Sequence, residues 1–194
     1  MKHFILTGSA CALAACSSPT TPSEFQSQNT FFASLSELCG RAFNGKLVST
    51  DEVDVDSGAQ SMVMHVRECS DREIRIPFHV GDDHSRTWVI SKQAEGLRLK
   101  HDHRHEDGSE DAVTQYGGDT AGEGTATRQS FPVDAVSIEM FEREGLTASV
   151  VNVWSVEVDE GLFAYELTRP NRLFRVEFDT ATPVTLPPAP WGYE

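Results

Sequence analysis

Apolar and polar residues alternate in a succession of short runs that fills most of the chain. A period of two is typical of strands that bury one face. Gly, Asp, Asn and Pro stand between the runs, as in GDD, AEG and RPN, which favours tight turns between antiparallel neighbours. The strands predicted in this way cover residues 46–50, 61–69, 73–80, 86–92, 97–105, 111–116, 136–142, 147–158, 162–169 and 172–178.

One stretch near the start follows a helical spacing instead. Its apolar residues are Phe31, Leu35, Leu38, Ala42 and Phe43. Asn29 or Thr30 is available as the N-cap, and Asn44-Gly45 is a stop signal. The spacing predicts one short amphipathic helix before the strands.

Many short strands after a single helix predict a mainly β fold, an antiparallel meander. Closing the meander into a barrel removes its exposed edges, so we expect an up-and-down barrel over residues 30–180. A β-sandwich is the alternative. Residues 181–194, ATPVTLPPAPWGYE, are rich in Pro, and we expect them to lie on the barrel as an extended strap, or else to bind a partner.

The order of helix, meander and closing hairpins resembles the layout of the lipocalin-like and calycin barrels. The segments LCG, MHVREC, IRIPFHVG and LRLKHDHRHEDGSED also resemble a family of exported bacterial proteins. The first likeness is one of layout, covers roughly residues 30–180, and implies the barrel. The second implies no activity.

The first residues have the layout of an export signal. Lys2 precedes an apolar run, which ends in Leu-Ala-Ala-Cys at residues 13–16. This ending resembles the lipobox of bacterial lipoproteins, which implies cleavage after residue 15, a diacylglyceryl group on Cys16, and acylation of the new amino terminus, typically with palmitate. Residue 17 is Ser and not the Asp that often marks inner-membrane retention, so the resemblance implies an outer-membrane anchor facing the periplasm. Residues 16–29 are then a polar tether.

The charge of the chain limits its partners. With 30 acidic and 16 basic residues, the formal net charge is −14. Such a chain repels phosphate backbones and anionic lipid surfaces. We therefore expect no nucleic-acid partner, and we expect the membrane contact to come from the lipid alone.

Two cysteines remain in the domain once Cys11 leaves with the signal and Cys16 takes the lipid. An even pair in an oxidising compartment predicts a disulfide between Cys39 and Cys69. Two free buried thiols or a redox pair are the alternatives.

Three histidines stand at every second position in LRLKHDHRHEDGSEDAVTQY, residues 97–116. Asp107-Gly108 between two alternating runs predicts a two-residue type I′ turn. In that register Arg104 lies opposite Asp111, a favourable cross-strand pair.

The same register places the histidine ladder, His101, His103 and His105, on the inner face of the barrel. The ladder climbs from an apolar floor at Leu99 toward the turn, as expected for the wall of a cavity that opens at a barrel mouth. We predict a pocket for a small ligand lined by His101, His103, His105, Glu110 and Tyr116.

The histidine ladder is also a candidate metal site. Residues i and i+2 of a strand are about 6.8 Å apart, and two imidazoles at that spacing can converge on one transition-metal ion such as zinc. Strand HxH pairs bind metal in the cupins, but here Gly96 lies one residue too close to His101, and the acid spacing after His103 also departs from that family. The departures put the cupin metal and its oxygenase chemistry in doubt. A polar lining that only hydrogen-bonds water is the third interpretation.

Other polar motifs carry less. His65 and His79 fall on the face away from the predicted cavity. The acidic stretch at 51–58 lacks the EF-hand spacing, and the Gly-rich stretch at 117–129 is expected to be a flexible loop at the barrel mouth, able to act as a lid. The chain has no GxSxG or HExxH motif, and no residue is predicted to be catalytic.

The sequence therefore predicts a lipid-anchored cell-envelope protein that binds a small ligand without catalysis. The first alternative is a transition-metal-binding protein or metal-dependent enzyme that uses His101, His103 and His105. The second is a structural or accessory lipoprotein of the cell envelope.

Overall fold

Short antiparallel strands are the main regular elements of the computed structural model, which describes residues 25–193. They are β1 (Ala42–Leu47), β2 (Met62–His65), β3 (Glu68–Cys69), β4 (Glu73–Val80), β5 (Asp83–Gln93), β6 (Gly96–His103), β7 (Tyr116–Asp119), β8 (Arg128–Pro132), β9 (Val153–Asp159), β10 (Leu162–Arg169) and β11 (Arg172–Asp179). The helical elements are α1 (Gln26–Ser36), η1 (Glu52–Asp54), α2 (Val55–Gly58), α3 (Ala135–Arg143) and η2 (Thr147–Ser149).

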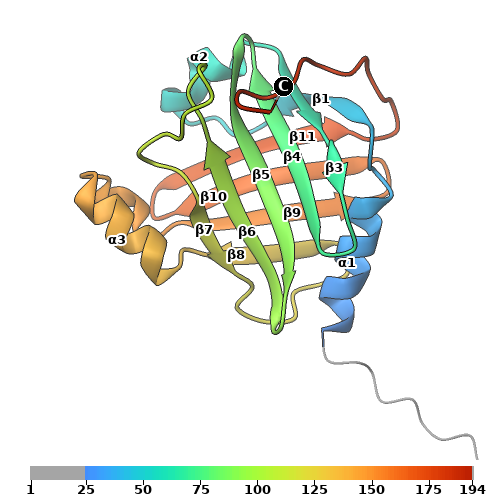
Figure 1. The fold of residues 1–194 in the computed structure, drawn as a ribbon, viewed down its shortest axis with the longest axis horizontal. Coiled ribbons are helices and arrows are strands. Elements are labelled where there is room, and N and C mark those ends of the chain that lie inside the picture. The colour runs from blue at the N-terminus through green and yellow to red at the C-terminus, as the bar shows by residue number, and fades with distance from the viewer. Residues whose placement is uncertain (1–24, 194) are drawn as a thin grey trace, which may run out of the picture.

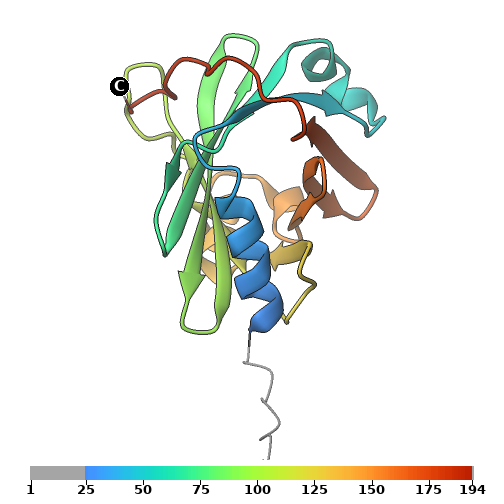
Figure 2. The same ribbon diagram turned by 90° about the vertical axis from the view of Figure 1, so that its right-hand side faces the viewer.

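These strands form one sheet in the order β7-β6-β5-β4-β2-β1-β11-β10-β9-β8, with β3 paired to β4. Strands that are adjacent in the sheet follow one another along the chain, and β1 then pairs with β11 to join the two halves. Figures 1 and 2 show the sheet curled on itself. The predicted up-and-down, barrel-like meander is confirmed in preference to a sandwich.

The two end strands, β7 and β8, come together without a regular ladder. The Asp134 amide donates to the Gly117 carbonyl at 2.9 Å. A Cβ added to Gly118 would lie 1.7 Å from the Pro132 carbonyl oxygen, so only glycine permits this approach. The barrel is therefore nearly closed at this seam.

The core lies between the inner face of the sheet and α1, which sits between the two sides of the barrel at one end (Figure 2). Phe31 and Leu35 of α1 are fully buried there. Burying a large apolar side chain stabilises a fold by roughly 1.5–3 kcal/mol. The large core side chains, each at most 2% exposed, include Phe43, Trp88, Leu99, Phe131, Trp154, Phe163 and Phe178.

The predicted helix is present, but its boundaries were wrong. It begins at Gln26, inside the stretch expected to be tether, and ends at Ser36. Ala42 and Phe43 belong to β1 instead. Gly40, with φ of 77°, lies between the helix and this strand, and a positive φ cannot continue a right-handed helix.

Two predicted strands were also wrong, and one strand was missed. Residues 136–142 lie in α3, because the Asp134 side chain accepts a hydrogen bond from the Ser137 amide and caps a helix that buries Met140 and Phe141. Residues 111–115 are irregular, and only Tyr116 begins a strand. The missed strand, β8, begins within the Gly-rich stretch at 117–129.

The predicted disulfide is confirmed. Cys39, just after α1, is bonded to Cys69 in β3, with a Cα–Cα distance of 6.3 Å and a sequence separation of 30. In the chain-entropy model, closing such a loop stabilises the fold by roughly 3 to 4 kcal/mol. The bridge joins the helix that fills the barrel to the wall of the barrel.

Residues 181–193, the C-terminal strap, cross the outer surface of the barrel (Figures 1 and 2). Val184 bridges to Ala42 at the start of β1, and the Trp191 amide donates to the His84 carbonyl at 3.1 Å. Within residues 25–193, no helix has the length and apolar content that a membrane span requires.

Candidate functional site

The chain that follows β6 does not form the predicted tight hairpin. β6 and β7 pair so that His101 lies opposite Tyr116. Nearer the turn, Arg104 bridges to Glu110 and not to Asp111. The predicted register is therefore wrong by one residue near the turn and by two residues where β6 pairs with β7.

Local side-chain bonds explain the difference. Asp107 Oδ1 accepts hydrogen bonds from the amide and hydroxyl of Ser109, at 2.9 and 2.6 Å. The His105 amide donates to the Ser109 carbonyl, which leaves three residues in the loop instead of two. Gln115, with φ of 56°, breaks the extended conformation just before β7.

The structure separates the three histidines of the ladder by depth. His101 is buried inside the barrel, His103 is half-buried above it, and the His105 side chain is 58% exposed on the loop. Glu110 is exposed on the same loop, whereas Tyr116 is half-buried against the inner pair. His101, His103 and Tyr116 therefore form one group, and His105 and Glu110 lie outside it.

Both ring nitrogens of His101 are hydrogen-bonded. Nδ1 lies 3.0 Å from the Tyr116 carbonyl, and Nε2 lies 2.7 Å from the Tyr165 hydroxyl. A carbonyl only accepts, so Nδ1 carries the proton. Burial, followed by the nearby His103, lowers the pKa of His101 to about 3. The ring is therefore neutral, and Tyr165 donates to Nε2.

His103 and Tyr116 form the second inner pair. The Tyr116 hydroxyl lies 3.2 Å from His103 Nε2, and the Tyr116 ring stacks on His101 at 4.4 Å between centroids. Burial is the main reason that the pKa of His103 falls to about 4, with Arg86 as the next cause. Burial also raises the pKa of Tyr116. All these groups are neutral at pH 7.

This geometry does not suit a metal ion. The rings of His101 and His103 are 6.5 Å apart between centroids, and both nitrogens of His101 already have partners. Among residues 25–193, no three His, Cys, Asp or Glu side chains are placed to hold a metal together. The described residues therefore do not offer the ladder as a zinc site.

A hollow of about 220 Å³ lies at the end of the barrel where His103 is found, which we call the mouth. Met62, Phe78, Val80 and Phe174 supply its apolar wall. Its polar lining consists of Ser57, Gln60, Asp83 and Arg86. The predicted pocket residues do not line it, so sequence reasoning missed the residues of this hollow.

Arg86 connects the hollow to the inner histidines. It lies opposite His103 in the β5–β6 ladder and forms an ion pair with Asp83. Below it, Trp88 stacks between Phe78 and Tyr165, at 4.7 and 4.3 Å between ring centroids. The aromatic rings form a rigid floor under a small amphipathic opening.

A second polar group, also missed, lies on the outer face of β4 and β6. Asp102 is 1% exposed, and its carboxylate accepts hydrogen bonds from Arg75, at 2.8 Å, and from the Tyr193 hydroxyl. Arg104 Nε lies 3.2 Å from the same carboxylate. We call Arg75, Asp102, Arg104 and Tyr193 the tyrosine clasp.

The ring of Tyr193 lies between the two arginines of the tyrosine clasp, each guanidinium 5.0 Å from the ring centroid. Arg67 also donates to the Tyr193 carbonyl at 2.9 Å. The sequence signal was the pair of aromatic residues that ends a Pro-rich tail. Its docking position could not be read from sequence, because Tyr193 and Asp102 are 91 residues apart.

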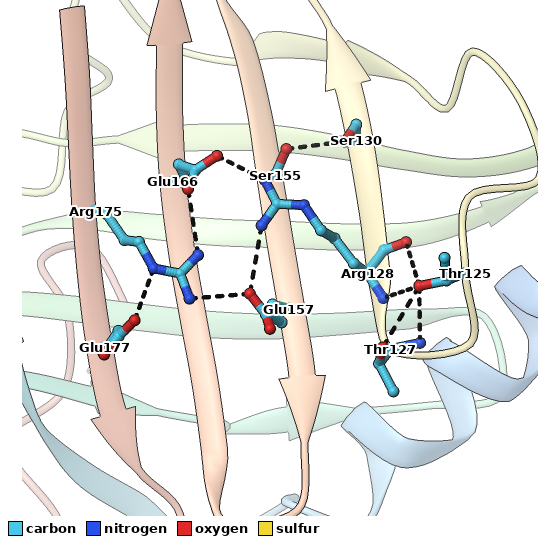
Figure 3. Close-up of polar contacts among 9 residues, drawn as sticks. All are labelled: Thr125, Thr127, Arg128, Ser130, Ser155, Glu157, Glu166, Arg175 and Glu177. Atoms are coloured by element: carbon cyan, nitrogen blue, oxygen red, sulfur yellow. Dashed lines mark hydrogen bonds and ion pairs between the residues drawn. The ribbon is translucent and has the colours of Figure 1, made fainter.

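The outer face of β8 to β11 carries an open charge network instead (Figure 3). Arg128 donates to Glu166 at 2.6 Å. Arg175 donates to Glu157 at 2.9 Å and to Glu177 at 2.8 Å, and these contacts raise the pKa of Arg175 against the effect of its burial. The network spans four strands and remains in contact with water.

The remaining candidates lie elsewhere. The Gly-rich loop is not at the mouth, because its Thr120 and Gly122 are bonded to Gln28 of α1 at the other end of the barrel. In the acidic stretch, Asp54 forms an ion pair with Arg172 at 2.6 Å. Cys16 and the predicted signal lie outside the described residues.

His65 and His79 are on the outer face, as expected, but they are buried there.

Compared with protein-family models, with curated protein sequences and with solved structures, the chain shows no match. Any functional conclusion therefore rests on the residues themselves.

Proposed function

We propose that this protein is a lipid-anchored cell-envelope protein that binds a small amphipathic molecule at the mouth of its barrel, without catalysing a reaction. The anchor in this proposal is lipidated Cys16 in the outer membrane. The domain then faces the periplasm, and the membrane contact is made through acyl chains such as palmitate.

The hollow beside Arg86 is the observation that carries the proposal. Four apolar side chains converge there with a few polar groups, which is the composition of small-molecule sites. Its volume of about 220 Å³ is below the usual 300–1,000 Å³ range, so the ligand is small or only partly enclosed. A molecule the size of benzoate or benzyl alcohol, with one apolar body and one polar end, suits this space.

The neutral His101 and His103 have an indirect role in this proposal. Their bonds to Tyr165 and Tyr116 hold the aromatic floor beneath the hollow in one arrangement. A buried polar network whose members are all bonded rigidifies a core. His101 and His103 thus shape the site without contacting the ligand.

The position of the helix supports the proposed anchoring. α1 begins at the end of the barrel opposite α2 and the mouth (Figures 1 and 2). A lipid on Cys16, nine residues before the described part begins, would leave the mouth pointing away from the membrane. The Cys39–Cys69 disulfide also fits an oxidising compartment.

Ligand binding can be tested by NMR titration of residues 17–194 with benzoate and benzyl alcohol, which share an apolar body and differ in charge. We expect amide shifts that cluster at Met62, Phe78 and Arg86, and the loss of those shifts in Phe174→Ala. Val136→Ala, an exposed change on α3, is the matched control. If neither compound shifts these amides, the proposed site is wrong.

The anchor can be tested separately in a Gram-negative host that is fed an alkyne-labelled palmitate. The full chain should incorporate the label and sediment with the outer membrane. Cys16→Ser should remain unlabelled and soluble in the periplasm. Equal labelling of both chains would contradict lipidation at Cys16.

A further inference from the structure

The C-terminal strap packs against His84, which lies beside His79 on the outer face of the barrel. The Trp191 ring packs toward His84 at 6.3 Å between centroids, and the His84 ring contacts His79 edge-on at 4.4 Å. His79 is 3% exposed although it points away from the core. His84 therefore shields His79 from water, and the strap holds His84 through the Trp191 amide and ring.

His79 is unusual because, among residues 25–193, neither of its ring nitrogens has a hydrogen-bond partner. A buried polar group without a partner costs free energy, and a buried charge without one costs far more. His101 differs, because each of its nitrogens is bonded. The outer site tolerates only the neutral form of His79.

Few charges near His79 favour its protonated form. On β2 and just after it, His65 and Arg67 face it, and on β5 it meets His84 and Asp83. Of these groups only Asp83 is acidic, and it is already paired with Arg86. Among the described residues, the strap segment nearest His84, Pro190 to Tyr193, has no charged side chain.

We propose that the C-terminal strap is released by acid. In this proposal, protonation of His79 drives Trp191 and Tyr193 off the outer face of β4 to β6. A protonated imidazole needs water or an acceptor, and lifting the strap is the shortest way to supply water. Release also exposes the Asp102 carboxylate and its two arginines as a new surface groove. This inference does not rest on ligand binding at the mouth, although Asp83 lies near both sites.

The direction of the effect follows from linkage. Burial and the neighbouring imidazoles lower the pKa of His79 to about 4, against 6.5 for a solvated histidine. A lifted strap restores the ordinary pKa, so the open form binds the proton more tightly. Acidification from pH 6.5 to pH 4 therefore shifts the open-to-closed ratio by roughly 80-fold.

The chain provides its own reporters for a test by fluorine NMR. Residues 17–194 labelled with 5-fluorotryptophan give one resonance each for Trp88, Trp154 and Trp191. The first two are at most 2% exposed and report on the core. Trp191 reports on the strap, and Tyr193→Ala at pH 7 gives the position of the released state.

Between pH 6.5 and pH 4 we expect the Trp191 resonance to move to the released position while the other two stay in place. His79→Phe and His79→Leu should each hold the Trp191 resonance at its closed position. His105→Gln, a change at an exposed histidine, should behave as the unmodified chain. The proposal fails if all three resonances of the unmodified chain move together or if its Trp191 resonance does not move. It also fails if the Trp191 resonance moves as far in the two His79 variants as in the unmodified chain.

Discussion

The two halves of the barrel treat their outer faces differently. Over β8 to β11, the charged side chains of the Arg–Glu network keep between 15% and 38% of their surface exposed (Figure 3). On the outer face of β4 to β6, the end of the C-terminal strap packs on the sheet, and Asp102, which bonds the Tyr193 hydroxyl, is 1% exposed although it points outward. In one half of the barrel, only the inner face of the sheet is packed. In the other half, the strap packs on part of the outer face as well.

The difference matters because the two kinds of polar group respond differently to change. Exposed ion pairs are screened by water and salt and contribute little each. A carboxylate that is 1% exposed depends fully on its partners, because removing one of them leaves a desolvated charge. The covered half should therefore be the sensitive half.

The largest expected effect is that of Asp102→Asn. The change removes the negative charge that Arg75 and Arg104 face and replaces one of the two acceptor oxygens with an amide donor, so two partly buried guanidinium groups are left without their counter-charge. We expect the free energy of unfolding to fall by about 3 kcal/mol. Urea titration followed by circular dichroism measures this fall.

The control for Asp102 is Asp119→Asn. Asp119 is also paired with an arginine, Arg98, at 2.6 Å, but its side chain is 46% exposed. Its loss should cost less than about 1 kcal/mol. Equal effects of the two substitutions would show that the strap does not desolvate Asp102.

Acid should weaken the histidine-rich half next. Every histidine of residues 25–193 lies between positions 65 and 105, in the covered half. For His101, burial lowers the folded-state pKa to about 3, so its stabilising effect is full above pH 6.5 and declines as the pH falls below that value. By pH 5 the loss should reach about 2 kcal/mol.

The variant His101→Gln isolates the part of the acid-dependent loss of stability that His101 causes. Urea titrations at pH 7 and pH 5 should show that the unmodified chain loses about 2 kcal/mol more than the variant between the two values. Identical losses would mean that His101 is solvated or charged in the folded protein.

The contrast between the halves also marks what sequence could predict. Alternation over 73–80, 86–92 and 162–169 predicted β4, β5 and β10, because each of these strands buries one face against the main core. Two cysteines left in the domain of a chain expected to be exported were enough to predict the disulfide. These features depend on local pattern or on counting.

The features that sequence missed depend on distant contacts or on small local bonds. Asp102 looked like a solvent-facing residue, since its burial comes from Tyr193, 91 residues away. The 136–142 run was too short to separate strand from helix by period, and the capping bond from Asp134 decided it. The hollow at the mouth unites β2, β4, β5 and β11, an arrangement visible only after closure.

A smaller effect is expected from Tyr193→Phe. The ring and its contacts with Arg75 and Arg104 remain, and only the hydroxyl that bonds Asp102 is lost. A hydrogen bond to a charged group contributes roughly 1.5–3 kcal/mol, but Asp102 keeps Arg75, so we expect a loss of about 1 kcal/mol. Urea titration measures the loss, and a value equal to that of Asp102→Asn would place the whole energy of the tyrosine clasp in the hydroxyl.

The smallest effect is expected in the open half, from Glu157→Gln. Glu157 accepts from Arg175 and from Arg128, at 2.9 and 3.4 Å, but its side chain is 25% exposed and Glu166 contacts both arginines as well. Because a second carboxylate remains for each guanidinium, the free energy of unfolding should fall by less than about 1 kcal/mol.

The effect of Glu157→Gln should shrink further at 1 M salt, where the Debye length is about 3 Å. The Asp102→Asn effect should persist at that salt concentration, because water and ions do not reach its carboxylate. Equal salt sensitivity of the two variants would remove the distinction between a covered and an open half.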